Sequence, residues 1–225
     1  MNIFAKTTVM AALAAAGAGI AAPAAAQVSG IATVDLPRAV VQSQAFQTGY
    51  QQIGTQYQAQ RTTIDQRNQQ RQQLVQTFDT NGDGQLDQTE AAATQDANNA
   101  TVRQIQAIDQ ELATLQQPSN RARVYVVQQV AQQYSAALQQ VVSDRNIQFV
   151  MAPESLIYAA DAADVTALVT TQLNSRVPTA QIVPPADWQP SEAAVGLFQQ
   201  VQQLLVLSAM AQQQQAAQQP ATSGR

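Results

Sequence analysis

The sequence contains no cysteine and no histidine, and its only lysine is Lys6. Without cysteine, the chain has no disulfide, no thiolate nucleophile and no thiolate ligand for zinc. Without histidine, and with no lysine after position 6, it lacks the groups that serve Ser-His and Cys-His triads, P-loops and Schiff-base enzymes. Pairs of acids remain, but none lies on a predicted rigid element. We therefore expect that this protein is not an enzyme.

Positive charge is also scarce. Lysine and arginine number 11 against 15 aspartates and glutamates, which gives a net charge of −4 and a pI near 4.6. The arginines are scattered along the chain and form no run. This balance argues against nucleic acid and anionic lipid as partners, because polyanions bind clustered positive charge.

Long apolar runs are absent except at the N-terminus. Lys6 precedes an apolar run over residues 8–22, and small residues directly before Gln27 form a signal-peptidase site. This pattern predicts a secretory signal peptide over residues 1–26, with a buried helix as the less favoured alternative. The later stretch 195–211 is interrupted by glutamines, so we expect no transmembrane segment after signal removal. Export without cysteine fits a location in the periplasm.

Residues 46–118 carry the spacing of a helical hairpin. One stripe on the first arm is formed by Phe46, Tyr50, Ile53, Tyr57, Gln60, Ile64, Arg67, Arg71, Leu74 and Phe78. Alternating steps of four and three are typical of a coiled-coil seam. The polar members of the stripe cluster in its distal half, so we expect that half to pack loosely.

A second helical stretch follows Glu90. Its stripe comprises Val102, Ile105, Ile108 or Asp109, Leu112 and Leu115, and after Pro118 it resumes with Val127, Ala131, Tyr134, Leu138 and Val141. Two arms of similar length predict an antiparallel hairpin in which Ile64 faces Ile105. In that register Pro118, which interrupts the stripe, lies level with Gly49 and Gly54. This coincidence indicates either a hinge or sequence drift at a tolerant surface.

The stretches on either side of the hairpin, residues 27–45 and 119–175, predict a small oligomerisation body. Residues 31–34 form a short β-branched run, and residues 147–152 and 156–159 predict a β-hairpin. The fold class is therefore mainly α with a small β body, from which a long antiparallel helical hairpin projects as a coiled-coil arm.

The C-terminal part continues this pattern. Asp164 is a suitable N-cap for a helix over residues 165–173. Residues 176–211 predict a proline-rich linker and a last helix that Ser191 caps. The glutamine-rich tail over residues 212–225 is expected to be disordered.

Both ends of the body resemble the Skp/OmpH family of periplasmic chaperones. The stretch "IATVDLPRAV", residues 31–40, resembles the family's first strand, the pattern Val34-Asp35-x-x-Arg38 and the helix that follows. The stretch "IQFVMAPESLIYAADAADVTALVTTQLN", residues 147–174, resembles the family's closing strand, turn and helix, the last opened by Asp164-Val165-Thr166. The resemblance covers about residues 31–174.

This resemblance implies a homotrimer in which strands of three chains build a central body and three hairpins surround a cavity. It also implies that unfolded outer-membrane proteins are held there without ATP. Well-known members are basic with lysine-rich arms, whereas this chain is acidic and has no lysine after position 6, so binding to anionic lipid is not implied. Residues from Val177 onward lie outside the resemblance.

The stretch "DTNGDGQLDQTE", residues 79–90, is a separate feature that the resemblance does not supply. It matches the twelve-residue EF-hand calcium loop, with glycine at position 6 for the sharp turn. The candidate Ca²⁺ ligands are the side chains of Asp79, Asn81, Asp83, Asp87 and Glu90 and the backbone carbonyl of Gln85. We expect weak binding, with a Kd on the order of 10⁻⁴–10⁻³ M. The alternative is a simple turn between the arms.

The helices of an EF-hand diverge by ~90–140°, whereas a coiled-coil arm needs antiparallel helices. The stretch "DANNATV" after the loop is a poor helix former, so we expect a short exit helix over about residues 88–95 that breaks before the chain re-enters the arm.

Three functions remain open. The motifs at both ends favour a holdase chaperone for unfolded outer-membrane proteins. The loop favours an EF-hand-type calcium-binding envelope protein with a structural coiled-coil stalk. A purely structural coiled-coil protein of the envelope is the third. The first two are compatible, because an ion in the loop would stiffen the tip of the arm.

Overall fold

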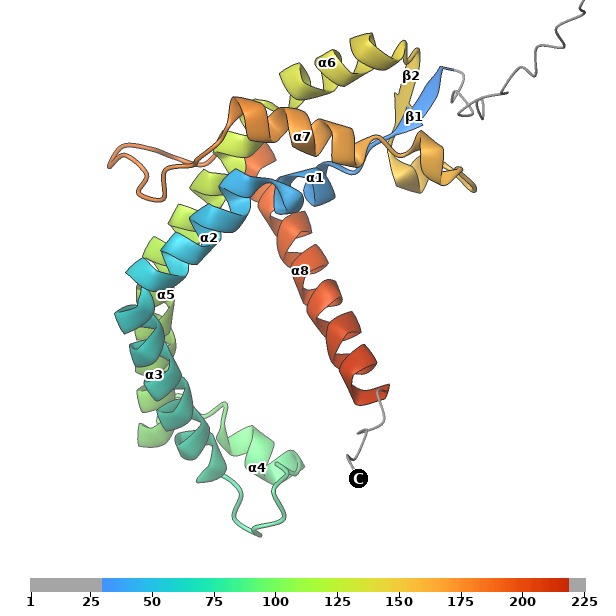
Figure 1. The fold of residues 1–225 in the computed structure, drawn as a ribbon. Coiled ribbons are helices and arrows are strands. Elements are labelled where there is room, and N and C mark those ends of the chain that lie inside the picture. Colours follow the sequence, from blue (N-terminus) through green and yellow to red (C-terminus); the bar gives the residue numbers. More distant parts are fainter. Residues whose placement is uncertain (1–29, 219–225) are drawn as a thin grey trace, which may run out of the picture.

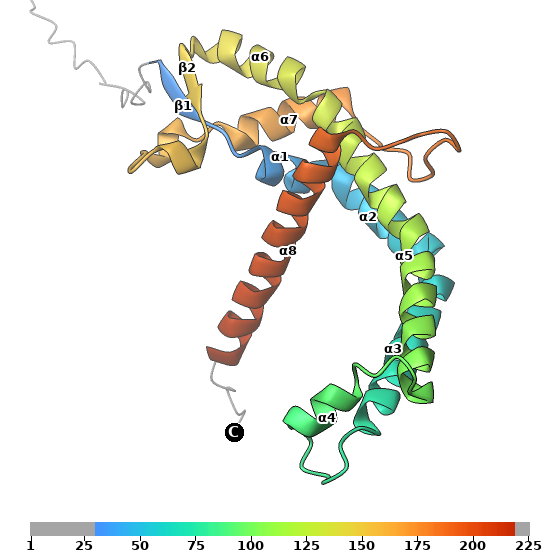
Figure 2. The same cartoon turned by 180° about the vertical axis from the view of Figure 1, so that it is seen from behind.

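The structure is a computed structural model that describes residues 30–218. The predicted signal peptide and residues 219–225 lie outside the described residues. A small body at one end carries a long curved arm and one long C-terminal helix (Figure 1, Figure 2). The chain is mainly helical with one small sheet, which confirms the predicted fold class.

The sheet of the body joins the two ends of the family-like region. Strand β1 (Ile31–Thr33) pairs in parallel with β2 (Phe149–Met151), and Ala32 lies opposite Val150. The predicted β-hairpin is wrong, because in the described part of the chain residues 156–159 form no strand. A 3₁₀ turn, η1 (Pro153–Ser155), follows β2. A β-hairpin needs a tight β-turn at this place to bring the next residues back beside β2.

Three helices complete the body around this sheet. Helix α1 (Leu36–Gln42) follows β1, while α6 (Tyr134–Arg145) and α7 (Thr166–Arg176) flank β2 in the sequence. A second 3₁₀ turn, η2 (Asp161–Ala163), leads into α7. The side chains at the centre of the body are fully buried: Val40, Val130, Val169 and Leu173. Burial of these branched side chains provides the main stabilisation of the body.

The arm consists of α2 (Gln44–Gln56) and α3 (Gln58–Gln76), which run antiparallel to α5 (Ala100–Gln132). All ten predicted stripe residues of the first arm are buried or half-buried, which confirms the seam. In the second arm Ile108 is buried and Asp109 is exposed, so the stripe runs through Ile108. Pro118 does not interrupt α5 as predicted, because it lies exposed inside a continuous helix.

The predicted register of the two arms is wrong. Arg67 contacts Glu111, and a Cβ on Gly49 would lie 3.1 Å from the methyl groups of Val126, so Ile64 cannot face Ile105. The predicted register assumes that the second arm begins directly after the loop. The exit helix α4 (Gln88–Ala93) and the turn after it occupy these residues instead. With the observed contacts, Pro118 lies level with the α2–α3 break at Tyr57 and not with the two glycines.

The linker over residues 177–191 is fixed to the arm near Pro118. The Arg121 guanidinium donates hydrogen bonds to the carbonyls of Pro185, Ala186 and Trp188. It also lies 5.5 Å from the centre of the Trp188 ring. Tyr125 packs edge-on against the same ring, with 4.9 Å between ring centres. These contacts determine where the last helix begins.

Helix α8 (Glu192–Gln218) is longer than predicted. Residues 212–218, which were expected to be disordered, are helical. Glutamine and alanine are good helix formers, and no proline lies between the start of α8 and Pro220. By length and composition alone, the stretch Glu192–Ala216 qualifies as a membrane span, with a mean hydropathy of 1.3. The glutamines within residues 195–211 predict no membrane span, yet this helix is long and apolar enough for one. Only 17% of an 18-residue window within that stretch is buried.

Candidate functional site

Two glycines of the loop at the tip of the arm have left-handed backbone conformations. Gly84, at the sixth position, has φ +80°, and Gly82, at the fourth, has φ +74°. A Cβ at either residue would meet nothing within 4 Å, so the conformation and not the available space requires glycine here. The motif predicted the role of Gly84. It gave no separate indication for Gly82.

The carboxylates and the amide of the first half of the loop accept hydrogen bonds from its backbone. Asp79 accepts from Gly82 N at 2.6 Å and from Gly84 N at 2.8 Å. Asn81 accepts from Asp83 N at 2.9 Å, and Asp83 accepts from Gln85 N at 2.8 Å. These short contacts hold the first half of the loop in one turn.

Glu90 connects the two ends of the loop. Its carboxylate accepts from the Thr80 N–H and hydroxyl, both at 2.7 Å, and from Asp87 N at 3.1 Å. The side chain is only 5% exposed. The Thr80 hydroxyl, together with these backbone donors, lowers the pKa of Glu90 to about 2.

Asp87 has a different task in this arrangement. Its carboxylate accepts from Thr89 N at 2.8 Å and Glu90 N at 2.9 Å. Together with the return bond from Asp87 N to Glu90, this forms a capping box at the start of α4. The predicted exit helix is therefore present, and the chain breaks after it before α5 begins at Ala100.

The six predicted ligands lie in one loop, but their acids do not surround a common point. Within residues 30–218, no three Asp or Glu side chains form a group that could hold a metal ion. Glu90 in particular is occupied by Thr80, a contact that the motif did not predict because it leaves the second position open. A calcium ion bound here would have to take Glu90 from these donors.

The distal arm is held together by charge pairs across its two helices. The Arg67 guanidinium lies 2.8 Å from Glu111, and Arg71 donates to Asp109 at 2.7 Å. The acidic partners come from α5, so they explain the two arginines on the predicted stripe. Helix α3 contains no buried residue, which agrees with the expected loose packing.

The two family-like motifs meet in one network at the body. Arg38 forms an ion pair with Asp164 and donates to the Thr166 hydroxyl at 3.1 Å. Asp35 caps α1 by accepting from Arg38 N at 2.9 Å, and its own N–H donates to Thr166 at 3.0 Å. Thr166 N donates to Asp164 at 2.9 Å. This network joins the start and the end of the body and leaves its charges paired.

One part of the body exposes large apolar side chains. Phe149 is 63% exposed, Tyr158 is 84% exposed and Ile157 has no cover at all. They lie on β2 and on the segment that follows η1. Large apolar side chains that are exposed in this way are candidates for contact with another protein.

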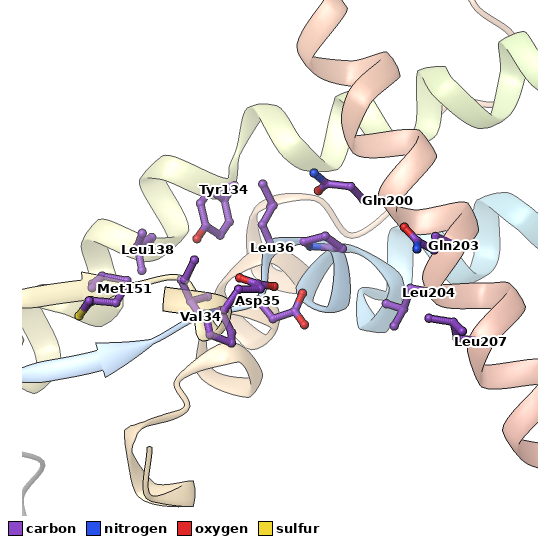
Figure 3. A pocket seen from close by; sticks show the side chains of 15 residues that line it. Val34, Asp35, Leu36, Tyr134, Leu138, Met151, Gln200, Gln203, Leu204 and Leu207 are labelled. Carbon is purple, nitrogen blue, oxygen red and sulfur yellow. The ribbon is translucent and has the colours of Figure 1, made fainter. Parts of the chain in front are cut away.

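A groove of about 820 Å³ lies between the body and α8; we refer to it as the body groove. Figure 3 shows Leu204 and Leu207 on α8 at one side of it and Val34 and Met151 at the other. Asp35 and Glu154 are the acids among its lining residues. The groove separates α8 from residues 150–154, which lie in the sequence between the exposed Phe149 and Ile157.

Comparison with known proteins connects these features. The model of the family described as "Outer membrane protein (OmpH-like)" matches residues 30–173. A search of curated proteins finds no match. One solved structure, described as an outer membrane chaperone (OmpH-like) from Caulobacter crescentus, is 19% identical with a TM-score of 0.39. The alignment covers 71% of this chain and 93% of that chain. The family assignment therefore depends on the family model.

Proposed function

The chain belongs to the OmpH-like family of outer membrane proteins, and from this premise we propose that it is a periplasmic chaperone. It would hold unfolded outer-membrane proteins between helical arms without ATP and without catalysing a reaction. The observation that carries the proposal is the arm itself, whose distal helix α3 has no buried residue in 19. Such an arm can bend around clients of different size, because few buried contacts must be broken.

The contact with clients is expected to depend little on charge. The chain is acidic and its arginines on the arm are few and partly paired with acids. Screening by salt acts on charges and leaves apolar and amide contacts largely unchanged. Client binding should therefore weaken only modestly as the salt concentration rises.

An aggregation assay tests this function. An outer-membrane β-barrel protein, diluted from urea, should remain soluble when the mature chain is present without nucleotide, and an equal mass of an unrelated acidic globular protein should not protect it. Light scattering at low and high salt gives both answers. Aggregation at the unprotected rate would exclude the holdase function, and a steep loss of protection with salt would exclude the uncharged mode of binding.

The family resemblance also favours a homotrimer closed through the body strands. A two-stranded sheet with strands of three residues leaves its edges open and buries little. Residues 156–159, predicted as a strand, could pair with such an edge in a neighbouring copy. The exposed Phe149, Ile157 and Tyr158 would then be covered.

Mass measurement by light scattering tests the trimer. The parent chain should have three times the mass of one chain, and a monomer at micromolar concentration would contradict the proposal. Ile157→Asp should weaken assembly, since it places a charge in the proposed contact. Thr171→Asp, an exposed change on α7, is the matched control and should assemble like the parent chain.

Calcium binding at the tip is a second proposal that the loop supports. Two left-handed glycines and the ordered ligands of the first half match the motif, although Glu90 must leave Thr80 to reach an ion. That competition is a reason to expect weak affinity, on the order of 10⁻⁴–10⁻³ M. A bound ion would stiffen the tip of a chaperone arm. In the alternative, an EF-hand-type envelope protein whose coiled coil is a stalk, binding of the ion would itself be the function.

Calorimetry with millimolar Ca²⁺ distinguishes a site from a turn. The parent chain should release heat and gain amide protection around Leu86, and Glu90→Gln should abolish both without changing the oligomer mass. Asp96→Asn, just outside the loop, should bind like the parent chain. If the parent chain gives no heat, or if Glu90→Gln binds equally well, the loop is only a turn and the chaperone proposal is unaffected.

A further inference from the structure

Within residues 30–218, the second part of α8 is exposed, and only Leu207 of this part borders the body groove. Up to Leu205 the helix packs on α1 and α5, with Ala194, Leu197 and Val201 buried. From residue 206 to residue 216 every residue is exposed. We call residues 206–218 the free half of α8. At 1.5 Å per residue it projects about 20 Å from the body.

The free half carries an apolar patch on the side opposite to the buried face. Val206 is 51% exposed, Leu207 57% and Met210 55%. With 100° between successive residues, these three lie across the helix from the face defined by Ala194 and Val201. The helix thus has one apolar side for its own chain and a second apolar side that starts where the first ends.

The helix carries no charge after Glu192. From Ala193 to Gln218 it contains only apolar, glycine, serine and glutamine residues. In a parallel association of identical helices each side chain meets its own copy, so any charge near the contact would be repelled by the same charge. A long helix without charge avoids this repulsion and offers no attraction to a charged partner.

Helix α8 lies on the side of the arm where the proposed function places the client. In both views α8 leaves the body on the concave side of the arm and descends toward the level of the tip (Figure 1, Figure 2). The body groove borders both α8 and the segment after β2 that precedes the exposed Ile157 and Tyr158. Copies joined through that segment would therefore bring their α8 helices to the same side.

We propose that the free halves of α8 in one oligomer associate with each other through Val206, Leu207 and Met210. This inference rests on the proposed homotrimer. Helices tethered in one assembly meet at an effective concentration on the order of millimolar, which favours their association over binding of an unattached partner at micromolar concentration. The resulting parallel bundle would stand between the arms and share the client space.

Cysteine crosslinking tests the contact directly, because the chain has no cysteine of its own. Met210→Cys should form covalent dimers under mild oxidation at least about tenfold faster than Ser208→Cys, since neighbouring helices in a bundle are about 8–10 Å apart. Ser208 lies on the opposite side of the same free half and is equally exposed. Equal rates for the two variants, or no crosslink at Cys-substituted position 210 in a trimer, would overturn the inference.

A second variant gives a readout that does not depend on oxidation. Met210→Glu should lower the thermal midpoint by about 2–4 °C, the effect of ~1 kcal/mol in a chain of this size, and Ser208→Glu should not. Both should keep the trimer mass, which the body determines. A monomeric parent chain would overturn the proposed trimer together with this inference, whereas a trimer with no effect of Met210→Glu would overturn the inference alone.

Two further experiments distinguish association of α8 with itself from binding of a client or of a membrane to the patch. A photoreactive label on the Met210→Cys variant should attach to a second copy of the chain. Attachment to an unfolded β-barrel client instead would identify the client as the occupant. Flotation of the chain with phosphatidylcholine vesicles would identify a membrane, for which α8 has sufficient length and hydropathy. Either result would overturn the association of α8 with itself.

Discussion

The two halves of the arm share one helical plan but are held together differently. Next to the body, α2 meets α5 through Phe46 and Ile53, which are 3% and 1% exposed, and through Gly49, whose missing side chain admits Val126. Farther out, α3 buries none of its residues and is joined to α5 by exposed charge pairs and half-buried side chains.

This difference indicates where the free energy of folding resides. Exposed ion pairs contribute about 0–1 kcal/mol each, whereas full burial of one large aliphatic side chain contributes about 1.5–3 kcal/mol. The proximal half therefore fixes the direction of the arm, and the distal half can deform at low cost. A holdase needs both properties, because its arms must remain attached and yet adapt to each client.

The largest expected effect separates the two halves by substitution. Ile53→Ala should lower the free energy of unfolding by about 2–5 kcal/mol, the usual cost of removing a buried aliphatic side chain. Ile64→Ala, in the half-buried seam of α3, should cost less than about 1 kcal/mol. Urea unfolding followed by circular dichroism measures both. Equal losses would show that the distal half is packed as firmly as the base.

The next effect concerns the junction between the halves. Pro118 lies exposed inside α5 and removes one backbone donor, level with the break between α2 and α3 at Tyr57. Pro118→Ala should raise the free energy of unfolding by about 1–3 kcal/mol and straighten the curved arm, which small-angle scattering can detect. Gln117→Ala is the matched control. A Pro118→Ala variant that is less stable than the parent chain would mean that the bend is needed for packing.

The elements of both halves could be predicted because their signals are local. The alternating spacing from Phe46 to Phe78 requires only that one face of a helix is covered, and the structure covers it. The register of the arms could not be predicted in the same way. It depends on how many residues the exit helix and its following turn use. The capping box of Asp87 and Glu90 marks locally where α4 begins, but no local signal sets how much chain separates the end of α4 from α5.

The misses in the body and at the tip have a similar origin. A strand over residues 156–159 needs a tight β-turn to pair with the open edge of β2, and the 3₁₀ turn η1 takes the place of that turn. The motif correctly predicted the glycine turn at Gly84, whereas its set of calcium ligands stays a prediction. It could not show that Glu90 accepts hydrogen bonds from Thr80. Several donors of the loop can reach the Glu90 carboxylate, and the motif does not say which of them it accepts from.

A smaller effect sharpens the difference within α2. A Cβ on Gly54 would meet nothing within 4 Å, so Gly54→Ala should raise the free energy of unfolding by about 0.5–1 kcal/mol through helix propensity alone. Gly49→Ala should lower it by about 1 kcal/mol, because the new methyl crowds the buried Val126. Adding Val126→Ala to Gly49→Ala should recover part of the loss. A stabilising Gly49→Ala would show that the base is less tightly packed than its distances indicate.

The smallest effect is confined to the tip and depends on pH. Hydrogen bonds from Thr80 lower the pKa of Glu90 from its usual 4.5 to about 2. Because the folded pKa lies below the unfolded one, the stabilisation is complete above about pH 4.5 and is lost as the pH falls toward 2. The amides of Thr80 and Asn81 should therefore lose protection from hydrogen exchange in this interval, after correction for the intrinsic rate.

Protection around Ile53 should persist through the same interval, since that contact contains no acid. Glu90→Gln should leave the tip open already at neutral pH and remove the acid transition, because an amide cannot provide the charged acceptor that these donors favour. Asp96→Asn should retain the transition of the parent chain. Simultaneous loss of protection at Thr80 and Ile53 would show that the arm opens as one unit, and the two halves would then not differ in stability as their contacts require.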